Sequence, residues 1–251
     1  MQLRYITCSD PREHNPIKDI IKLGVLPEAE IAVQCHPSKM SDGMPRNVWF
    51  KELLSAAYSI PTLNLAIHIN NDWANDICVN GKIPDEIINF LGARNSAKKP
   101  AIKRIQINMP VLTADNINPA AVARIIHDFC TREFIFQYND STKSAVEKLH
   151  QTGAKFSLLF DASGGKGEQP DKWEKPIYET HPMGYAGGIS PDNVVDTLRK
   201  INAVVPQKHR IWIDAEGRLK SNNLFDEKMK FDIELARSYI IRANSFANQK
   251  E

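Results

Sequence analysis

The sequence predicts a (β/α)8 barrel, in which parallel strands and helices alternate around a closed sheet. Two observations predict it: short apolar segments with strand character recur roughly every thirty residues, and segments with helical spacing follow most of them. A length of 251 residues also suits one barrel domain. No linker or low-complexity segment divides the chain, so we expect a single domain over 1–251 with a polar tail over 244–251. An open, doubly wound sheet is the alternative.

Each predicted element has a local signal. The strands are short apolar runs, expected at Leu3–Thr7, Glu30–Cys35, Leu63–Ile69, Lys103–Asn108, Glu133–Tyr138, Lys155–Phe160, Met183–Ala186 and Arg210–Ile213. The helices show apolar residues at helical spacing and are expected at Pro16–Leu23, Val48–Tyr58, Pro84–Phe90, Pro119–Cys130, Ser141–Gln151, Pro191–Ile201 and Lys228–Ala243. Asn118 before Pro119 and Ser190 before Pro191 are helix-start signals, and Gly153 is a stop signal.

Composition and charge exclude several classes of function. The net charge is +2 and no basic block stands out, so nucleic acid is not expected as the main partner. No apolar stretch approaches the ~20 residues that span a bilayer, and the N-terminus has no signal-peptide pattern. The four cysteines lack C-x-x-C spacing, which predicts a reduced, cytoplasmic enzyme or binding protein. We expect a monomer or a homodimer.

Several strands turn polar on one face near their carboxyl ends. Gln106 and Asn108 alternate along the fourth strand, and the same spacing recurs in the second, third and fifth strands at Gln34 and His36, His68 and Asn70, and Gln137 and Asn139. Burying an unpaired amide costs roughly 1–3 kcal/mol, so these side chains should line something polar. They form either a hydrogen-bonded layer that caps the barrel or an active site, which in this fold lies at the carboxyl ends of the strands. We expect the active site.

A glycine pair after the seventh strand predicts an anion site. Gly187 and Gly188 let backbone N–H groups approach an anion, and the helix expected from Pro191 adds partial positive charge. Barrels often hold phosphate after the seventh and eighth strands, and the eighth loop offers Gly217 and Arg218. The alternative is a plain tight turn before a helix.

At these positions the chain resembles phosphoribosylanthranilate isomerase, a barrel enzyme of tryptophan biosynthesis. "AGGISPDNV" at 186–194 resembles the family's phosphate loop, Ala-Gly-Gly-Leu-Asn-Pro-Glu-Asn-Val. "LLFD" at 158–161, followed by "GGKG" at 164–167 and Trp173, resembles Leu-Leu-Asp-Ser, Gly-Gly-Thr-Gly and Asp-Trp. Cys8 closes the first strand as in Lys-Ile-Cys-Gly, and the segment around Arg46 resembles Ser-Pro-Arg-Tyr-Val.

The resemblance implies a barrel of the ribulose-phosphate-binding type that carries out an Amadori rearrangement of a phosphorylated ribose derivative, without a cofactor or metal. It implies Asp161 as the acid at the ring oxygen and Cys8 as the base at C2′. The glycines after Asp161 would form a mobile lid, and Arg46 would pair with the aromatic carboxylate of the substrate. The other implied contacts are substrate binding by Gln106 and Asn108 and phosphate binding by Gly187, Gly188, Gly217 and Arg218. Apart from the resemblance, Cys8 suits a small buried residue, Asp161 a turn cap and Arg46 a solvated loop.

Two other functions stay open. A metal-dependent pentose-phosphate epimerase uses histidine ligands at the ends of the second and third strands, where His36 and His68 stand, although the expected carboxylates are missing. A barrel that binds a phosphorylated metabolite without turnover is favoured by Glu216, which stands where the family has a serine and adds negative charge near the predicted phosphate.

Overall fold

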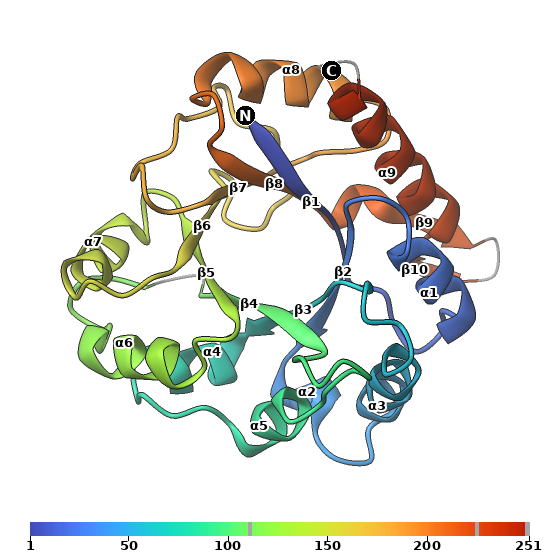
Figure 1. Cartoon of the computed structure of the whole chain (residues 1–251), viewed down its shortest axis with the longest axis horizontal. Helices are drawn as coiled ribbons and strands as arrows, with labels where there is room; N and C mark the ends of the chain where they lie inside the picture. Colours follow the sequence, from blue (N-terminus) through green and yellow to red (C-terminus); the bar gives the residue numbers. More distant parts are fainter. Residues whose placement is uncertain (110–111, 224–225, 249–251) are drawn as a thin grey trace.

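A computed structural model shows a closed barrel of eight parallel strands (Figure 1). It describes residues 1–109, 112–223 and 226–248. The strands follow chain order around the barrel, and the last pairs with the first. Their bounds are β1 Gln2–Ser9, β2 Ala29–Cys35, β3 Leu65–Asn70, β4 Ile102–Asn108, β5 Glu133–Tyr138, β6 Ser157–Phe160, β7 Met183–Ala186 and β8 Arg210–Ala215. The predicted strands and the (β/α)8 fold are confirmed, and the alternative of an open sheet is wrong.

Alternation along the strands separates an outer apolar face from an inner face that carries polar side chains together with a small apolar cluster of Ile135, Leu159 and Trp212. In β1, the Thr7 hydroxyl donates to Glu30 of β2 at 2.8 Å. Ser9, on the same side, donates to Asp214 of β8 at 2.6 Å. Cys8 lies between them in sequence, so its side chain points to the opposite face, where the strands pack against helices in one apolar core. The inner face therefore carries the polar chemistry of the barrel.

Helices cover the outside of the barrel, as Figure 1 shows. Their bounds are α1 Ile17–Gly24, α2 Pro37–Met40, α3 Pro45–Ala57, α4 Asn71–Cys78, α5 Asp85–Leu91, α6 Pro119–Asp128, α7 Lys143–Gln151, α8 Val194–Val204 and α9 Ile233–Asn248. The seven predicted helices are present with shifted ends, whereas α2 and α4 occupy stretches without a predicted element. Asn118 caps α6 as predicted, because its side chain accepts a hydrogen bond from the Ala121 amide.

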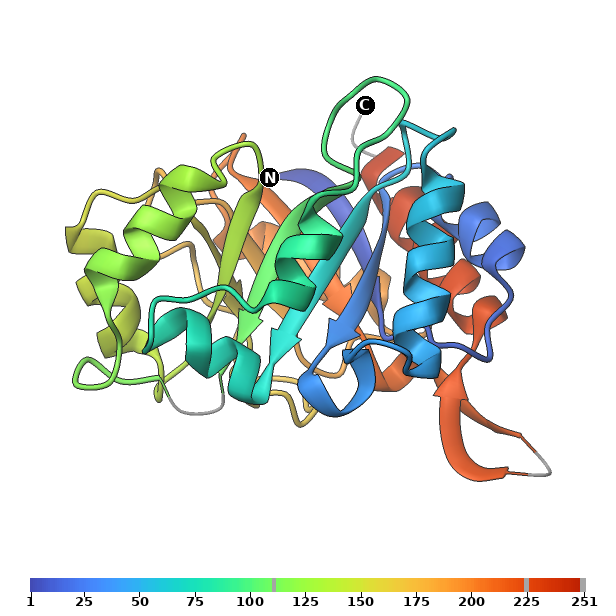
Figure 2. The same ribbon diagram turned by 90° about the horizontal axis from the view of Figure 1, so that it is seen from below.

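The chain after β8 departs most from the prediction. A short 3-10 turn, η1 Gly217–Leu219, leads into a hairpin of β9 Lys220–Asn223 and β10 Asp226–Phe231, which projects at the carboxyl end of the barrel in Figure 2. Since β10 takes up the region from Lys228, the last helix begins only at Ile233. It continues to Asn248, so residues 244–248 of the predicted tail are helical, and 249–251 lie outside the described residues. Within the described ranges, no helix combines the length and apolarity that crossing a membrane requires.

A buried cation occupies the inside of the barrel. Arg104 Nη1 donates to Glu30 Oε1 at 2.7 Å, and its Nε lies 3.5 Å from Glu133 Oε2. The guanidinium lies 4.6 Å from the ring centroid of Tyr5 and 4.1 Å from that of Trp212. Burial raises the pKa of Glu30, and Arg104 opposes this rise. One side chain thus connects β1, β2, β4, β5 and β8 through charge and ring contacts.

Gly184 in β7 makes room for Trp212, and its replacement by alanine is expected to destabilise the barrel. A Cβ on Gly184 would lie 2.0 Å from Trp212 Cε2, so the indole would have to move. We expect a loss of about 1–3 kcal/mol in the free energy of unfolding, measured by urea denaturation. Gly217→Ala is the control, because a Cβ there meets no atom within 4 Å and should change stability little. Equal effects of the two substitutions would contradict this account.

Candidate active site

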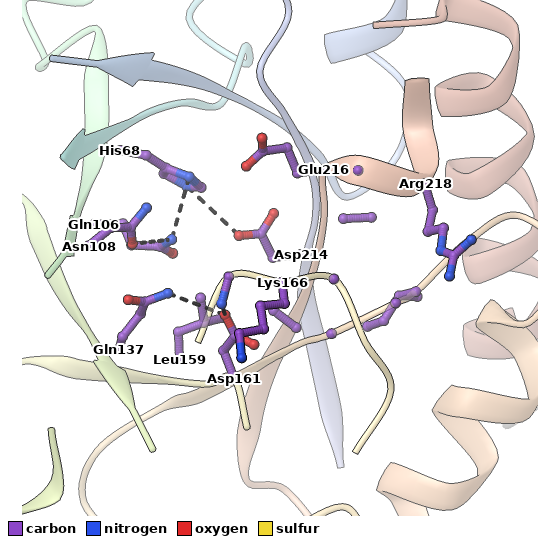
Figure 3. Close-up of a pocket in the computed structure, with 18 residues that line it drawn as sticks. His68, Gln106, Asn108, Gln137, Leu159, Asp161, Lys166, Asp214, Glu216 and Arg218 are labelled. Carbon is purple, nitrogen blue, oxygen red and sulfur yellow. Dashed lines mark hydrogen bonds and ion pairs between the residues drawn. The ribbon is translucent and has the colours of Figure 1, made fainter. Parts of the chain in front are cut away.

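A cavity of about 160 Å³ opens at the carboxyl ends of the strands. Side chains from β3, β4, β5, β6 and β8 line it, together with the glycine turns after β6, β7 and β8. Figure 3 labels its principal side chains, which are His68, Gln106, Asn108, Gln137, Leu159, Asp161, Lys166, Asp214, Glu216 and Arg218. The predicted location of the active site and seven of its predicted residues therefore coincide with one cavity; these are Gln106, Asn108, Asp161, Gly187, Gly188, Gly217 and Arg218.

Asp161 is held by donors immediately after β6. Its Oδ2 accepts a hydrogen bond from the Gly165 amide at 2.7 Å and another from Gln137 Nε2 at 3.3 Å. Its Oδ1 accepts from the Ser163 hydroxyl at 2.8 Å. Asp161 thus accepts three hydrogen bonds, two of them from the turn that directly follows it. The glycine after the apolar strand thus has a local reason: the Gly165 amide turns back, with a φ of 91°, onto Asp161.

A second buried carboxyl group, Asp214 of β8, faces the same cavity. Burial raises its pKa to about 7, although the hydrogen bond from Ser9 lowers it. The neighbouring charges of Glu216 and Asp161 raise it further. Asp214 therefore retains a proton up to about neutral pH, in contrast to the donor-rich surroundings of Asp161.

His68 of β3 is neutral and oriented by amides. Burial lowers its pKa to about 4. Its Nδ1 lies 3.5 Å from Gln34 Nε2 and 3.4 Å from Gln106 Nε2, and both amides can donate only if Nδ1 accepts. The ring proton is then on Nε2, which lies 4.0 Å from Asp214 Oδ2. Figure 3 shows His68 directed toward Asp214 across the mouth of the barrel.

The raised pKa of Asp214 predicts a pH-dependent cost in stability. An unfolded aspartate titrates near 3.9, so between about pH 4 and pH 7 the folded protein holds one proton more and stability falls as pH rises. Asp214→Asn removes this dependence. Relative to the unmodified protein, the variant should gain on the order of 1–3 kcal/mol between pH 5 and pH 8. Urea unfolding at the two pH values measures the difference, and a pH-independent effect would refute the assignment.

The glycine pair after β7 lies under another loop. Gly187 and Gly188 have φ values of 119° and 59°. A Cβ on Gly187 would lie 2.7 Å from the Glu168 carbonyl oxygen, and one on Gly188 would lie 2.9 Å from the Gln169 nitrogen. The close approach of the β6–β7 loop is therefore by itself a reason for glycine at both positions, separate from any binding of an anion. The predicted helix start also moves, because 191–193 form turns and α8 begins at Val194.

Glu216 faces the cavity but does not stand there unpaired. Gln34 Nε2 donates to its Oε2 at 2.8 Å, and Lys220 Nζ lies 2.9 Å from its Oε1. Lys220 also lies 2.9 Å from Asp10 Oδ2. Two cations, Lys166 and Arg218, line the cavity as well. The cavity thus combines carboxyl groups with positive charge on its loop side.

Cys8 is not brought to the cavity, which corrects its assignment as the base. Its side chain is fully buried in the core between barrel and helices. Burial raises the pKa of its thiol well above the ordinary value, and the charges of Asp214 and Glu30 raise it further. A buried thiol with a raised pKa stays protonated, and Cys8 is not among the residues that line the cavity.

Arg46 and His36 also lie away from the cavity lining. Arg46, the second residue of α3, is 5% exposed and contacts Glu13 Oε2 at 3.2 Å and Asp10 Oδ1 at 3.5 Å. These carboxylates neutralise its charge, so the predicted pairing with a substrate carboxylate is not what the structure shows. His36 follows β2 and its Nδ1 lies 3.1 Å from the Ser38 hydroxyl. His36 and His68 therefore do not line a common site.

Sequence reasoning missed Asp214, Ser9 and the position of Lys166 beside the cavity. The signal was present for two of them. In β1 the apolar Ile6 and Cys8 share one parity and the polar Thr7 and Ser9 the other, and only one parity can face the barrel interior. In β8, Asp214 stands two residues before Glu216 and so faces the same side of the strand, and Glu216 had already been placed near the predicted phosphate site.

Comparisons with known proteins add little to the geometry. No protein-family model matches the chain, and no curated protein sequence matches it significantly. Among solved structures, it is similar to 3-hexulose-6-phosphate synthase from Salmonella typhimurium, with a TM-score of 0.49 and 10% sequence identity over 96% of this chain and 99% of the other. The closed order of the eight strands, and not this likeness, establishes the fold.

Proposed function

We propose that this barrel is an isomerase of a phosphorylated ribose derivative that works by acid and base catalysis. The single observation that carries the proposal is a pair of buried carboxyl groups in contrasting surroundings, Asp161 and Asp214, which face one cavity at the catalytic end of the barrel.

The two carboxyl groups divide the roles of base and acid. Asp161, surrounded by three donors, is the base that removes the proton from C2 of the sugar. Asp214 holds its proton up to about pH 7 and donates it to the ring oxygen as the bond from C1 to that oxygen breaks. Exchange with water restores both groups. This reverses the role that the family resemblance implies for Asp161 and replaces Cys8 by Asp214.

The remaining walls suit a sugar phosphate. Gln106, Asn108 and His68 present amide and imidazole groups that can hydrogen-bond to hydroxyls. Arg218 and Lys166, on the loops after β8 and β6, supply positive charge beside the glycine turns, where a phosphate is expected. The finer proposal is phosphoribosylanthranilate as substrate, in an Amadori rearrangement of tryptophan biosynthesis, carried out without a cofactor by a cytoplasmic monomer or homodimer.

Proton exchange tests the chemistry before the substrate is known. The protein would be incubated in D2O with ribose 5-phosphate, ribulose 5-phosphate and phosphoribosylanthranilate, and NMR would follow deuterium at the carbon next to the carbonyl or imine. We expect incorporation with at least one of them, and turnover of phosphoribosylanthranilate in particular supports the finer proposal. If calorimetry shows that one of these sugar phosphates binds but neither exchange nor turnover is detected, the isomerase proposal is wrong and a non-catalytic binding protein takes its place.

A chelator is expected to leave turnover unchanged. The epimerase alternative needs metal ligands at the ends of β2 and β3, but His36 does not line the cavity. His68 Nδ1 is already directed at two glutamine amides. Turnover measured after dialysis against EDTA checks this, and a loss that zinc or iron restores would favour the epimerase.

A further inference from the structure

A second and larger cavity lies at the opposite, amino-terminal end of the barrel. Its volume is about 970 Å³, within the upper range of small-molecule sites. It is lined by the first residues of β5, β6 and β8, which are Glu133, Ser157 and Arg210, and by the ends of α6 and α7. The proposed isomerase chemistry at the carboxyl ends makes no use of this cavity.

The cavity is strongly basic. Four cations line it, Arg4, Arg132, Lys155 and Arg210, against the single carboxylate of Glu133. That carboxylate is already shared, because Arg4 lies 3.6 Å and Arg104 3.5 Å from its Oε2, and Ser157 donates to its Oε1 at 2.6 Å. Lys155 and Arg210 are exposed. The cavity therefore has positive charge in excess of its own counter-ions.

Arg132 shows the excess most clearly. It is only 8% exposed, and its guanidinium donates to the Leu91 carbonyl oxygen and to the Thr131 hydroxyl, neither of which is charged. Its Nε is buried with no hydrogen-bond partner. Burial lowers the pKa of Arg132, and the charge of Arg94 lowers it further. A buried guanidinium with a free donor and no carboxylate is the expected environment of an anion-binding residue.

A wall of rings stands beside these cations. His150 Nδ1 lies 2.9 Å from His181 Nε2, so the two imidazoles share one hydrogen bond. His150 stacks on Tyr178 at 3.8 Å, and His181 stacks on Phe156 at 4.4 Å between ring centroids. His150, His181 and Phe156 line the cavity. Stacking fixes the planes of these rings; Phe156 and His181 are buried, and the half-buried His150 is the ring of the three that can contact a flat ligand.

We propose that this cavity binds an organic polyanion with a planar ring, of the nucleotide phosphate class. The cations come from separate elements, which suits a ligand that carries more than one negative charge. The half-buried imidazole of His150, held in place by its contacts with His181 and Tyr178, suits contact with a base, and a volume of about 970 Å³ accommodates a nucleotide. The site is separate from the catalytic end and does not depend on the isomerase reaction.

Cys130 provides a local readout. It lines the cavity and is exposed, whereas Cys8, Cys35 and Cys78, the other cysteines of the sequence, are all described and buried. The neutral reagent iodoacetamide should therefore modify Cys130 first, as mass spectrometry can verify. With ADP at tenfold its calorimetric Kd, the reaction should slow about tenfold, because only the free fraction of the site reacts. Pyrophosphate, which lacks the ring, should protect only at higher concentration.

Two double variants test whether ADP binds to the cations of this cavity or responds only to the overall positive charge of the protein. Lys155→Gln with Arg210→Gln removes two exposed cations of the cavity and should raise the Kd of ADP at least about tenfold. Lys18→Gln with Lys200→Gln removes two exposed cations elsewhere and should leave it unchanged. Protection should persist in Asp161→Asn. The proposal is overturned if millimolar ADP leaves the alkylation rate of Cys130 unchanged, or if both pairs weaken binding equally.

Discussion

Asp161→Asn is expected to lower kcat/KM by about 10²–10⁴-fold, the usual contribution of a positioned general base. Asparagine keeps the shape of the side chain: its oxygen can accept from the Gly165 amide while its NH2 group donates to the Ser163 hydroxyl, which then acts as acceptor, so the loop after β6 should stay in place. It has no carboxylate to take a proton from C2. Deuterium exchange should fall with turnover, since both depend on the same proton transfer.

The control for this variant is Asp140→Asn, the same chemical change in an exposed loop one strand away. Asp140 pairs with Lys143 at 3.0 Å and its side chain is 99% exposed, so its replacement should leave kcat/KM unchanged. Under the proposed mechanism Asp214 is the acid, and its pKa of about 7 predicts that turnover by the unmodified protein declines as pH rises through about 7. Full turnover by Asp161→Asn would remove the proposed mechanism.

Arg104→Met is expected to destabilise the fold by about 3–5 kcal/mol, because it leaves Glu30 buried without its cation. The thioether also forgoes the ring contacts with Tyr5 and Trp212. The pKa of Glu30 is already raised by burial, and the loss of Arg104 raises it more. When the pKa of a carboxyl group is higher in the folded than in the unfolded protein, the free energy of unfolding decreases as pH rises above the unfolded pKa. The loss of stability caused by Arg104→Met should therefore be larger at pH 8 than at pH 5.

Urea unfolding at both pH values measures this effect. Two further variants serve as a test of the cause and as a control. Combining Arg104→Met with Glu30→Gln removes the orphaned charge and should recover part of the lost stability. Arg199→Met removes an exposed arginine that pairs with Asp196 at 2.6 Å on α8, and it should cost less than about 1 kcal/mol. A loss from Arg104→Met no larger than this control would show that the buried cluster contributes little.

The strands and the position of the site were predictable because both depend on local patterns. Apolar runs marked each strand, period-two alternation put Gln106 and Asn108 on one face at the carboxyl end of the fourth strand, and Asp161 directly follows the sixth. The hairpin of β9 and β10 was not predictable in this way, because its residues are polar and resemble a helix start. Asp232, which accepts hydrogen bonds from two amides at the start of α9, marks the true boundary.

Cys8 shows why a motif can mislead. A cysteine at the end of the first strand matched a family pattern, yet the alternation of the strand places its side chain on the same outer, apolar face as Ile6. The neighbours Thr7 and Ser9 occupy the inner face through their bonds to Glu30 and Asp214. Parity depends on the local backbone and decides which face a side chain joins, whereas a motif records only position along the chain.

The sequence by itself determined the eight-strand barrel, the end at which polar side chains gather and the glycine turns beside them, because these follow from periodicity and from the special backbone needs of glycine. Only the tertiary structure decided which carboxyl groups share a cavity, that burial raises the pKa of Asp214 to about 7, and that Arg46 is already paired. Desolvation and ion pairing depend on distances between residues far apart in the chain, and no local pattern encodes those distances.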